Sequence, residues 1–162
     1  MKKISFVYDL TEEYRVIGIC SHLKDYKLCW NLNKVLNIDL LKIDDFSFNR
    51  KNAEGEKYSF YYFYDQNSRN DIFLISNKKN NSSLLEKIPE ADFLLMIKGF
   101  CSEKKVEELI SALKKTNNIL TAFSVNMNKI KEMNSFLTET ELHQLNFEKK
   151  EIKNPVFSGP DF

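Results

Sequence analysis

The chain has 162 residues, of which 43% are hydrophobic and 13% aromatic, so it can bury a substantial core and does not have a disordered composition. Its 24 basic residues (Lys and Arg) and 23 acidic residues (Asp and Glu) give a net charge of +1. A nucleic-acid-binding protein usually carries a basic excess, because neutralising phosphates supplies much of its affinity. The composition therefore does not favour nucleic acid as a partner.

Nothing in the sequence indicates a membrane or secreted protein. The N-terminal residues include two lysines but lack the apolar core of a signal peptide, and no run approaches the roughly 18 apolar residues of a membrane span. Cys20, Cys29 and Cys101 are odd in number and lie in apolar segments, which is typical of reduced, buried thiols. We therefore expect a cytoplasmic location and no membrane contact.

The first third of the chain predicts two strands and a helix. Residues 4–9 and 14–20 are rich in β-branched and aromatic residues, which indicates strands. Residues 23–36 follow with helical periodicity and without Pro or Gly, and Ser21 is a candidate N-cap. Residues 39–57 are expected to form a loop or a short irregular element.

The remainder predicts a hairpin, a central strand, a second helix and one more strand. The aromatic run 58–65 and the apolar run 71–76 flank a polar loop, and the near-continuous apolar run 92–98 is typical of a central strand. Ser102 is the expected N-cap of a helix over residues 103–115. This helix has a single apolar stripe, and its other faces are charged or small. A strand over 119–125 and a short helix near 128–137 complete the order.

This order, β-β-α-β-β-β-α-β, predicts an α+β fold. We expect a two-layer sandwich, a variant of the ferredoxin-like arrangement, with a mostly antiparallel sheet and both main helices on one face. The expected organisation is one domain over residues 1–137 and an extended C-terminal tail over residues 138–162, which contains two prolines.

The predicted helix 23–36 is apolar on two sides. One stripe comprises Leu28, Cys29, Leu32, Val35 and Leu36, and at about 100° per residue a second group, Leu23, Tyr26 and Trp30, lies on nearly the opposite side. Trp and Tyr are enriched at binding hot spots, so Leu23, Tyr26 and Trp30 are candidate partner-binding residues. The alternative is that the 39–57 segment or the C-terminal tail covers this side within the same chain.

The predicted hairpin offers a second candidate surface. Tyr58, Phe60, Tyr62 and Tyr64 alternate onto one face of the strand, and if both helices cover the other face these rings need a cover. Tyr62 and Tyr64 are therefore further candidate partner-binding residues. The strand also has a faint similarity to the aromatic strand of RNA-recognition domains, but it lacks the two glycines of that signature.

The sequence contains no pattern that we associate with catalysis, and we expect no catalytic residue, cofactor or metal. Of the two histidines, His22 adjoins Ser21 in sequence, whereas the members of a catalytic triad converge from separate segments. The spacing of Cys20, His22 and Cys29 matches no structural zinc pattern, and with four glycines no phosphate-binding loop is evident.

Three segments together resemble a known family. They are Val16-Ile17-Gly18-Ile19-Cys20-Ser21-His22-Leu23-Lys24-Asp25-Tyr26-Lys27-Leu28-Cys29-Trp30-Asn31-Leu32-Asn33, Phe73-Leu74-Ile75-Ser76-Asn77 and Ile88-Pro89-Glu90-Ala91-Asp92-Phe93. The chain resembles the IPExxVDY family of uncharacterised small proteins from Bacteroidota over roughly residues 1–130. It departs from the family motif, because only Ala91 separates Glu90 from Asp92 and Phe93 replaces the tyrosine. This shortening indicates a turn leading into a strand, and the resemblance implies no activity.

The sequence thus favours a non-enzymatic cytoplasmic protein that acts through contact with a protein partner or a second copy of itself. One alternative is an RNA-binding module that uses the aromatic sheet face. The other is an enzyme acting on a small molecule, which requires a pocket where groups such as His22, Asp25 and Asp92 converge.

Overall fold

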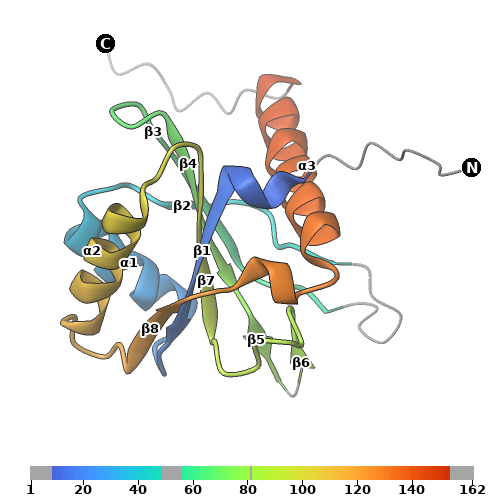
Figure 1. Cartoon of the computed structure of the whole chain (residues 1–162). Helices are drawn as coiled ribbons and strands as arrows, with labels where there is room; N and C mark the ends of the chain where they lie inside the picture. The colour runs from blue at the N-terminus through green and yellow to red at the C-terminus, as the bar shows by residue number, and fades with distance from the viewer. Residues whose placement is uncertain (1–8, 49–55, 81, 154–162) are drawn as a thin grey trace, which may run out of the picture.

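The computed structural model describes residues 9–48, 56–80 and 82–153. Its elements, in chain order, are η1 (Leu10–Glu13), β1 (Tyr14–Cys20), α1 (Asp25–Leu36), β2 (Leu41–Lys42), β3 (Phe60–Asp65), β4 (Asn70–Ser76), β5 (Lys78–Lys79), β6 (Ser82–Ser83), β7 (Phe93–Lys98), α2 (Glu103–Lys114), β8 (Thr121–Ser124), η2 (Met127–Lys129) and α3 (Met133–Lys153) (Figure 1). No helix in the described ranges is long and apolar enough to cross a membrane. The strand predicted over residues 4–9 lies almost wholly outside the described residues.

The main sheet has six strands in the order β2-β3-β4-β7-β1-β8, and every neighbouring pair is antiparallel. The β7-α2-β8 connection spans one intervening strand, β1, as in the ferredoxin-like arrangement. The β1-α1-β2 connection spans β7, β4 and β3, because the chain passes through the edge strand β2 and then β3 before it reaches β4, which β7 separates from β1. The predicted α+β class, the antiparallel sheet and the hairpin of β3 and β4 are confirmed, as is the central position of the strand predicted over 92–98.

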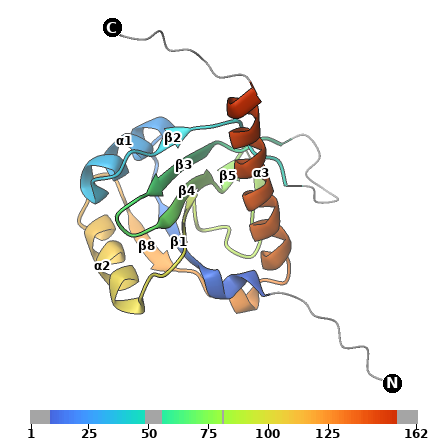
Figure 2. The same cartoon turned by 90° about the horizontal axis from the view of Figure 1, so that it is seen from above.

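One face of the sheet packs against α1 and α2, as predicted, and Figure 2 shows both helices on the same side. The strands contribute alternate residues to this face, because successive side chains of a strand point to opposite faces. The buried members are Ile17, Ile19, Tyr61, Ile72, Leu74, Phe93, Leu95, Ile97 and Ala122 from the strands, and Leu28, Cys29, Leu32, Val106 and Leu113 from the helices. Ser102 caps α2 as predicted, since its hydroxyl accepts a hydrogen bond from Lys105 N (3.2 Å).

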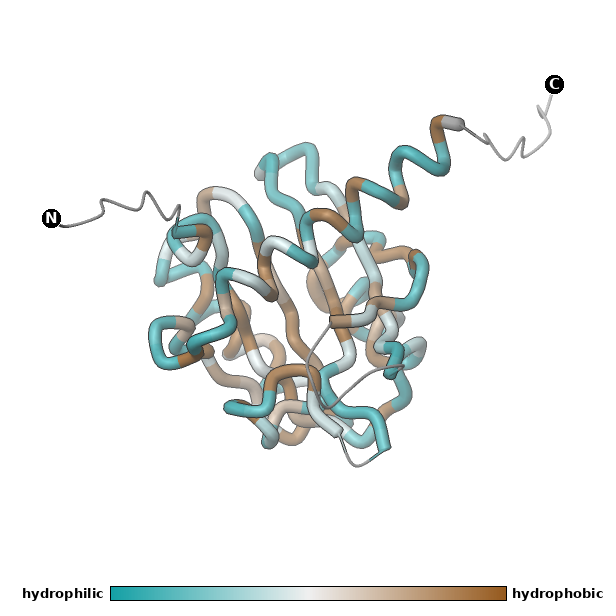
Figure 3. Tube along the Cα trace, turned by 90° about the vertical axis from the view of Figure 1, so that its right-hand side faces the viewer, coloured by the Kyte–Doolittle hydropathy of each residue, from teal (hydrophilic) through white to brown (hydrophobic). Residues whose placement is uncertain are grey.

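The other face is covered by α3, which adds a third layer to the two that were predicted (Figure 2). The prediction of an extended tail from residue 138 is wrong for residues 138–153, which continue α3. The short helix predicted near 128–137 covers the beginning of α3, and its continuation was missed because the inward stripe includes two buried polar residues, Thr140 and Gln144. They lie between Phe136, Leu137 and the half-buried Phe147. Figure 3 shows α3 crossing the sheet and its C-terminal turns extending past the body of the molecule.

Segment 43–48 helps α3 to cover this face. Ile43, Phe46 and Phe48 are buried there, and Phe46 forms an isolated β-bridge with Tyr58. The region predicted as a loop over 39–57 therefore supplies core residues and the short edge strand β2, while residues 49–55 lie outside the described ranges.

The predicted N-cap of α1 is also wrong. The N-cap position is Lys24, without a side-chain cap, and Ser21 instead accepts from Leu23 N (3.2 Å) and donates to Asn118 O (2.6 Å). The Ser21 hydroxyl is thus engaged by the loops before α1 and before β8, and α1 begins at Asp25, two residues after the predicted start at residue 23.

The three segments that carry the family resemblance meet at one end of the sheet. Asn77 is fully buried; its amide nitrogen donates to Ile88 O (2.9 Å) and Ala91 O (2.8 Å), and its oxygen accepts from Leu85 N (2.8 Å). Asp92 accepts from Ser21 N (2.8 Å). These bonds hold the turn around residues 88–92 against β1 and β4, as expected of a turn that leads into a strand.

Candidate functional site

The outward side of α1 presents the two largest exposed aromatic side chains of that helix. Tyr26 and Trp30 are 56% and 60% exposed, one turn apart, while Leu28, Cys29 and Leu32 on the opposite side are buried. Leu23, the third residue predicted for this surface, is half-buried and packs against the core beneath α1. Within the described ranges no segment covers Tyr26 and Trp30, so we refer to Tyr26, Trp30 and their flanking lysines Lys24, Lys27 and Lys34 as the α1 face.

The charge of the α1 face is positive. Lys34 places its Nζ 3.6 Å from the centroid of the Trp30 ring, which is a cation–π contact, and Lys24 and Lys27 are exposed on the flanks. Asp25, the acidic residue of the first turn, is engaged from below by the hydroxyl of Tyr61 (2.8 Å). The surface therefore combines apolar rings with cations.

A lysine-rich pocket adjoins the beginning of α1. It has a volume of about 390 Å³, and its lining includes Lys24, Lys42, Lys57, Lys78 and Lys79 against the two carboxylates of Asp25 and Asp45. Part of this charge is paired, since Lys42 lies 3.9 Å from Asp45 and Lys78 lies 3.6 Å from Asp92. The excess of ammonium groups extends the positive potential of the α1 face around the end of the sheet.

The structure does not bring Tyr62 and Tyr64 to the α1 face. Both lie on the sheet face that α3 covers: the half-buried Tyr62 ring packs against Phe73 (centroids 5.3 Å apart) and its hydroxyl donates to Asp71, whereas Tyr64 is exposed. Tyr58, from the same predicted row, is buried. The five predicted partner-binding residues thus belong to two surfaces on opposite sides of the sheet.

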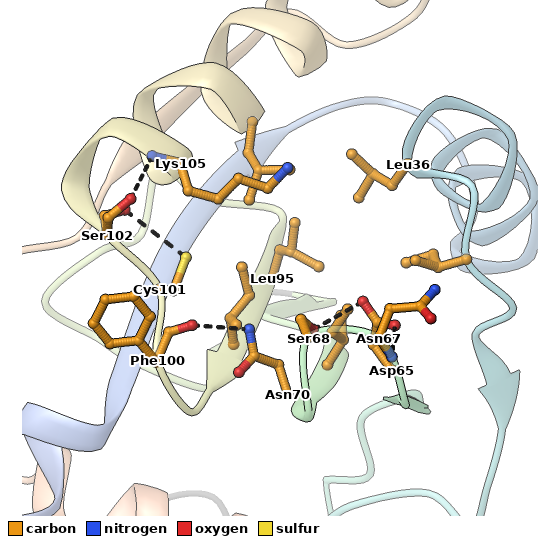
Figure 4. Close-up of a pocket in the computed structure, with 14 residues that line it drawn as sticks. Leu36, Asp65, Asn67, Ser68, Asn70, Leu95, Phe100, Cys101, Ser102 and Lys105 are labelled. Atoms are coloured by element: carbon orange, nitrogen blue, oxygen red, sulfur yellow. Dashed lines mark hydrogen bonds between the residues drawn. The ribbon is translucent and has the colours of Figure 1, made fainter.

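A third concave surface lies between α1 and α2 (Figure 4). This pocket has a volume of about 450 Å³, and its floor is formed by buried apolar side chains of β4 and β7, namely Ile72, Leu95 and Ile97. Figure 4 shows Lys105 reaching across it from α2 toward Leu36 at the end of α1. The hairpin loop forms its rim, where Asp65 accepts hydrogen bonds from Asn67 N (3.0 Å) and the Ser68 hydroxyl (2.9 Å).

His22, Asp25 and Asp92, the groups considered for catalysis, and the second histidine, His143, are each either exposed to solvent or in contact with neighbouring residues. His22 is exposed, and the ring of His143 packs against Phe46 and Phe60 while its Nε2 lies 2.6 Å from Asp44 O. Asp25 lines the lysine-rich pocket, whereas Asp92 is engaged by Ser21 and Lys78.

The three cysteines are free thiols. Burial raises the pKa of Cys29 to about 11, and burial likewise raises the pKa of Cys20 and Cys101. A raised pKa disfavours the nucleophilic thiolate. Among the described residues no group of three or more His, Cys, Asp or Glu side chains is placed to hold a metal ion.

Sequence reasoning missed the lysine-rich pocket, because its five lysines come from four separate segments of the chain. It also missed the residues that α3 contributes to the other sheet face, Glu141, Gln144 and Glu148, because that region was expected to be extended. The charged residues at the ends of β4 and β7, Asp71 and Lys98, could have indicated this polar site. A charged residue at the end of an apolar strand often faces a polar partner.

The fold and its surfaces define an α+β protein with a split β-α-β connection and a basic, aromatic helix face. No family model matches the chain, and no curated protein matches it.

Proposed function

We propose that this protein is a non-enzymatic interaction module that binds an acidic partner protein through the α1 face. The observation that carries the proposal is the exposure of Tyr26 and Trp30 side by side on one helix. Exposed large aromatic groups cost free energy in water, and Trp and Tyr are the residues that most often dominate binding energy at protein interfaces.

The charge around these rings indicates the chemistry of the partner. Lys24, Lys27 and Lys34 flank them, so the complementary surface has an apolar anchor surrounded by carboxylates. A second copy of the chain is a poorer fit, because a two-fold contact through the α1 face would place the lysines of one copy against those of the other. The same reasoning makes the lysine-rich pocket a secondary contact for the partner's acidic residues.

The RNA-binding alternative receives less support. It requires an open aromatic sheet face, and α3 with segment 43–48 lies over that face. Tyr58 is buried there, Tyr62 is half-buried, and only Tyr64 of these three tyrosines is exposed.

The resemblance to the IPExxVDY family also stays a proposal. It is supported by the convergence of the three resembling segments around Asn77, which is consistent with a shared structural role for them.

The test is a pull-down of the tagged full-length protein from its native lysate, with and without RNase, compared with Trp30→Ala and with Leu142→Ala. Leu142 is an exposed apolar residue of α3, on the other side of the sheet, and serves as the matched control. We expect an acidic partner that survives RNase and is retained by the control. Trp30→Ala should weaken its affinity by a factor of roughly 30, as for a hot-spot residue that contributes about 2 kcal/mol.

Charge reversal on the α1 face is a second test of the proposal. The double variant Lys27→Glu, Lys34→Glu should abolish capture, and capture by the unmodified protein should fall as salt concentration rises. The proposal is wrong if the partner is retained equally by Trp30→Ala, if capture disappears with RNase, or if no partner is recovered at all.

A further inference from the structure

A pocket of about 400 Å³ lies beneath the C-terminal half of α3, on the sheet face opposite α1. Its floor includes Tyr64, Asp71 and Lys98, which belong to one row of paired residues across neighbouring strands, and Tyr14 of β1 continues this row beside the pocket. Paired residues of an antiparallel sheet point to the same side, so this row faces α3. From α3 the pocket receives Glu141, Gln144, Leu145 and Glu148, and Tyr62 and Phe73 complete its lining.

The carboxylates of this pocket are only partly engaged. Glu141 Oε1 accepts from Lys98 Nζ and from the Tyr14 hydroxyl, both at 2.9 Å, and Asp71 Oδ1 accepts from the Tyr62 hydroxyl. Burial and these carboxylates raise the pKa of Tyr14 and of Tyr62, so both hydroxyls remain donors. In the described part of the chain, Glu141 Oε2, Asp71 Oδ2 and the Glu148 carboxylate have no hydrogen-bond or ion-pair partner.

The formal charge of the lining is negative. Asp71, Glu141 and Glu148 supply three negative charges and Lys98 one positive charge, which leaves a net charge of −2. Carboxylates brought together around a cavity repel one another unless a cation lies among them. Lys98 supplies part of this compensation and is already bound to Glu141.

Gln144 is the independent indication of a ligand. Its side chain lines the pocket and the residue is only 8% exposed, yet within the described ranges nothing hydrogen-bonds its amide. Its polar atoms are not sealed in the protein, because the one fully enclosed, unpartnered side-chain polar atom of the described residues is Asn70 Oδ1. Because the Gln144 amide has no partner among the described residues and is accessible from the pocket, it offers one hydrogen-bond acceptor and two donors to an occupant.

The lining also selects the kind of cation. The rings of Tyr62, Tyr64 and Phe73 form an aromatic wall suited to an organic cation. The unpaired carboxylate oxygens and the Gln144 carbonyl oxygen require a cation with several N–H donors.

We propose that this pocket binds an organic cation with N–H donors, a guanidinium or primary ammonium group, between the Tyr64 ring and the carboxylates of Asp71 and Glu148. The group can belong to a free amine or to an arginine or lysine side chain of a peptide. The site is independent of the α1 face, from which the sheet separates it, so the two proposals can fail separately.

The test is a titration of the full-length, ¹⁵N-labelled protein followed by NMR chemical shifts, with ethylguanidinium, n-butylammonium or tetramethylammonium chloride as probes and NaCl as the ionic-strength control. We expect the first two to saturate shifts of α3 and of the β3–β4 hairpin in the millimolar range. Tetramethylammonium, which has no N–H donor, should bind at least roughly tenfold more weakly. Blocked arginine and lysine amides distinguish a side-chain ligand, which should bind more tightly than the bare probe, from a free amine.

The variants are chosen to leave the fold intact. Glu148→Gln removes one exposed carboxylate of the pocket and should weaken binding by roughly tenfold, while Glu139→Gln, an equally conservative change on the exposed side of α3, should have no effect. Gln144→Met keeps the volume and removes the amide, and should weaken binding by a similar factor. Equal binding of tetramethylammonium, equal effects of Glu148→Gln and Glu139→Gln, or shifts that NaCl reproduces would each overturn the proposal.

Discussion

At the scale of single residues, glycine and asparagine occupy positions where no larger or less polar side chain fits. Gly18 in β1 lies under the ring of Phe123 in the neighbouring strand β8, and a Cβ placed at Gly18 would lie 2.5 Å from Phe123 Cζ. The pair is in register across the two strands, so the ring occupies the space that a side chain at Gly18 would need.

We expect Gly18→Ala to lower the free energy of unfolding by about 1–3 kcal/mol, because the ring of Phe123 must move out of a packed layer. Urea denaturation followed by circular dichroism measures this. In the double variant Gly18→Ala, Phe123→Leu the smaller side chain should restore part of the loss. An unchanged midpoint in the single variant would show that the ring moves at no cost.

Asn77 is the second such residue, and replacing it should be more damaging. Asn77→Ala leaves Leu85 N, Ile88 O and Ala91 O without their partner at a fully buried site, so we expect a loss of about 3 kcal/mol or more. Asn126→Ala is the control, since that exposed side chain makes one hydrogen bond at the start of η2 and its loss should cost about 1 kcal/mol or less. Comparable losses in the two variants would contradict the role assigned to Asn77.

At the scale of elements, α3 has two halves with different functions. Its first half buries Met133, Phe136 and Leu137 against the sheet, and its second half carries the pocket residues and then extends past the sheet. The exposed residues of the last turns include Ile152, which is 79% exposed. The stability of the helix therefore depends on its first half.

We expect Phe136→Ala to cost about 3–5 kcal/mol, because it opens a cavity in the layer between α3 and the sheet, and Ile152→Ala to change the free energy of unfolding by less than about 0.5 kcal/mol. Chemical denaturation of both variants measures the difference. Amide hydrogen exchange should agree, with strong protection around residue 136 and weak protection at residues 148–152. Similar costs for the two substitutions would mean that the end of α3 is packed more firmly than its exposure indicates.

At the scale of the whole molecule, the sheet joins two apolar layers. Its central strands contribute to both, since Leu95 faces α1 and α2 while Leu94 and Met96 face α3. Loss of either layer removes the support of the other, so we expect the described body to unfold as one cooperative unit.

The three thiols report on this unit. Cys29 and Cys101 are buried and Cys20 is half-exposed, so at pH 8 a thiol reagent should modify Cys20 first. With a pKa near 11, Cys29 carries little thiolate at pH 8 in the folded state, and unfolding lowers its pKa toward the ordinary value and exposes it. Ellman's reagent should therefore detect one thiol promptly and two more at the rate of unfolding, with denaturant making all three reactive. Prompt reaction of all three without denaturant would contradict the packing.

The fold could be predicted where hydrophobic periodicity is strong. The alternation in β3, the continuous apolar run of β7 and the stripe of α2 identified these elements, because each buries a face with its own period. The exposed aromatic side of α1 was also readable, since Tyr26 and Trp30 fall on the side opposite Leu28 and Leu32. Periodicity failed for α3, where the polar residues Thr140 and Gln144 occupy buried positions.

The sequence by itself thus determined the fold class, the order of the central elements and the side of α1 that remains exposed, because burial of apolar side chains follows the local period of the backbone. Only the tertiary structure decided that α3 closes the second face, that five lysines from four segments surround one pocket, and that Asp71, Lys98, Glu141 and Gln144 meet under α3. These sites depend on strand register and on the position of α3, whose Glu141 is 43 residues from Lys98 and 70 residues from Asp71 along the chain, and no local pattern encodes such separations.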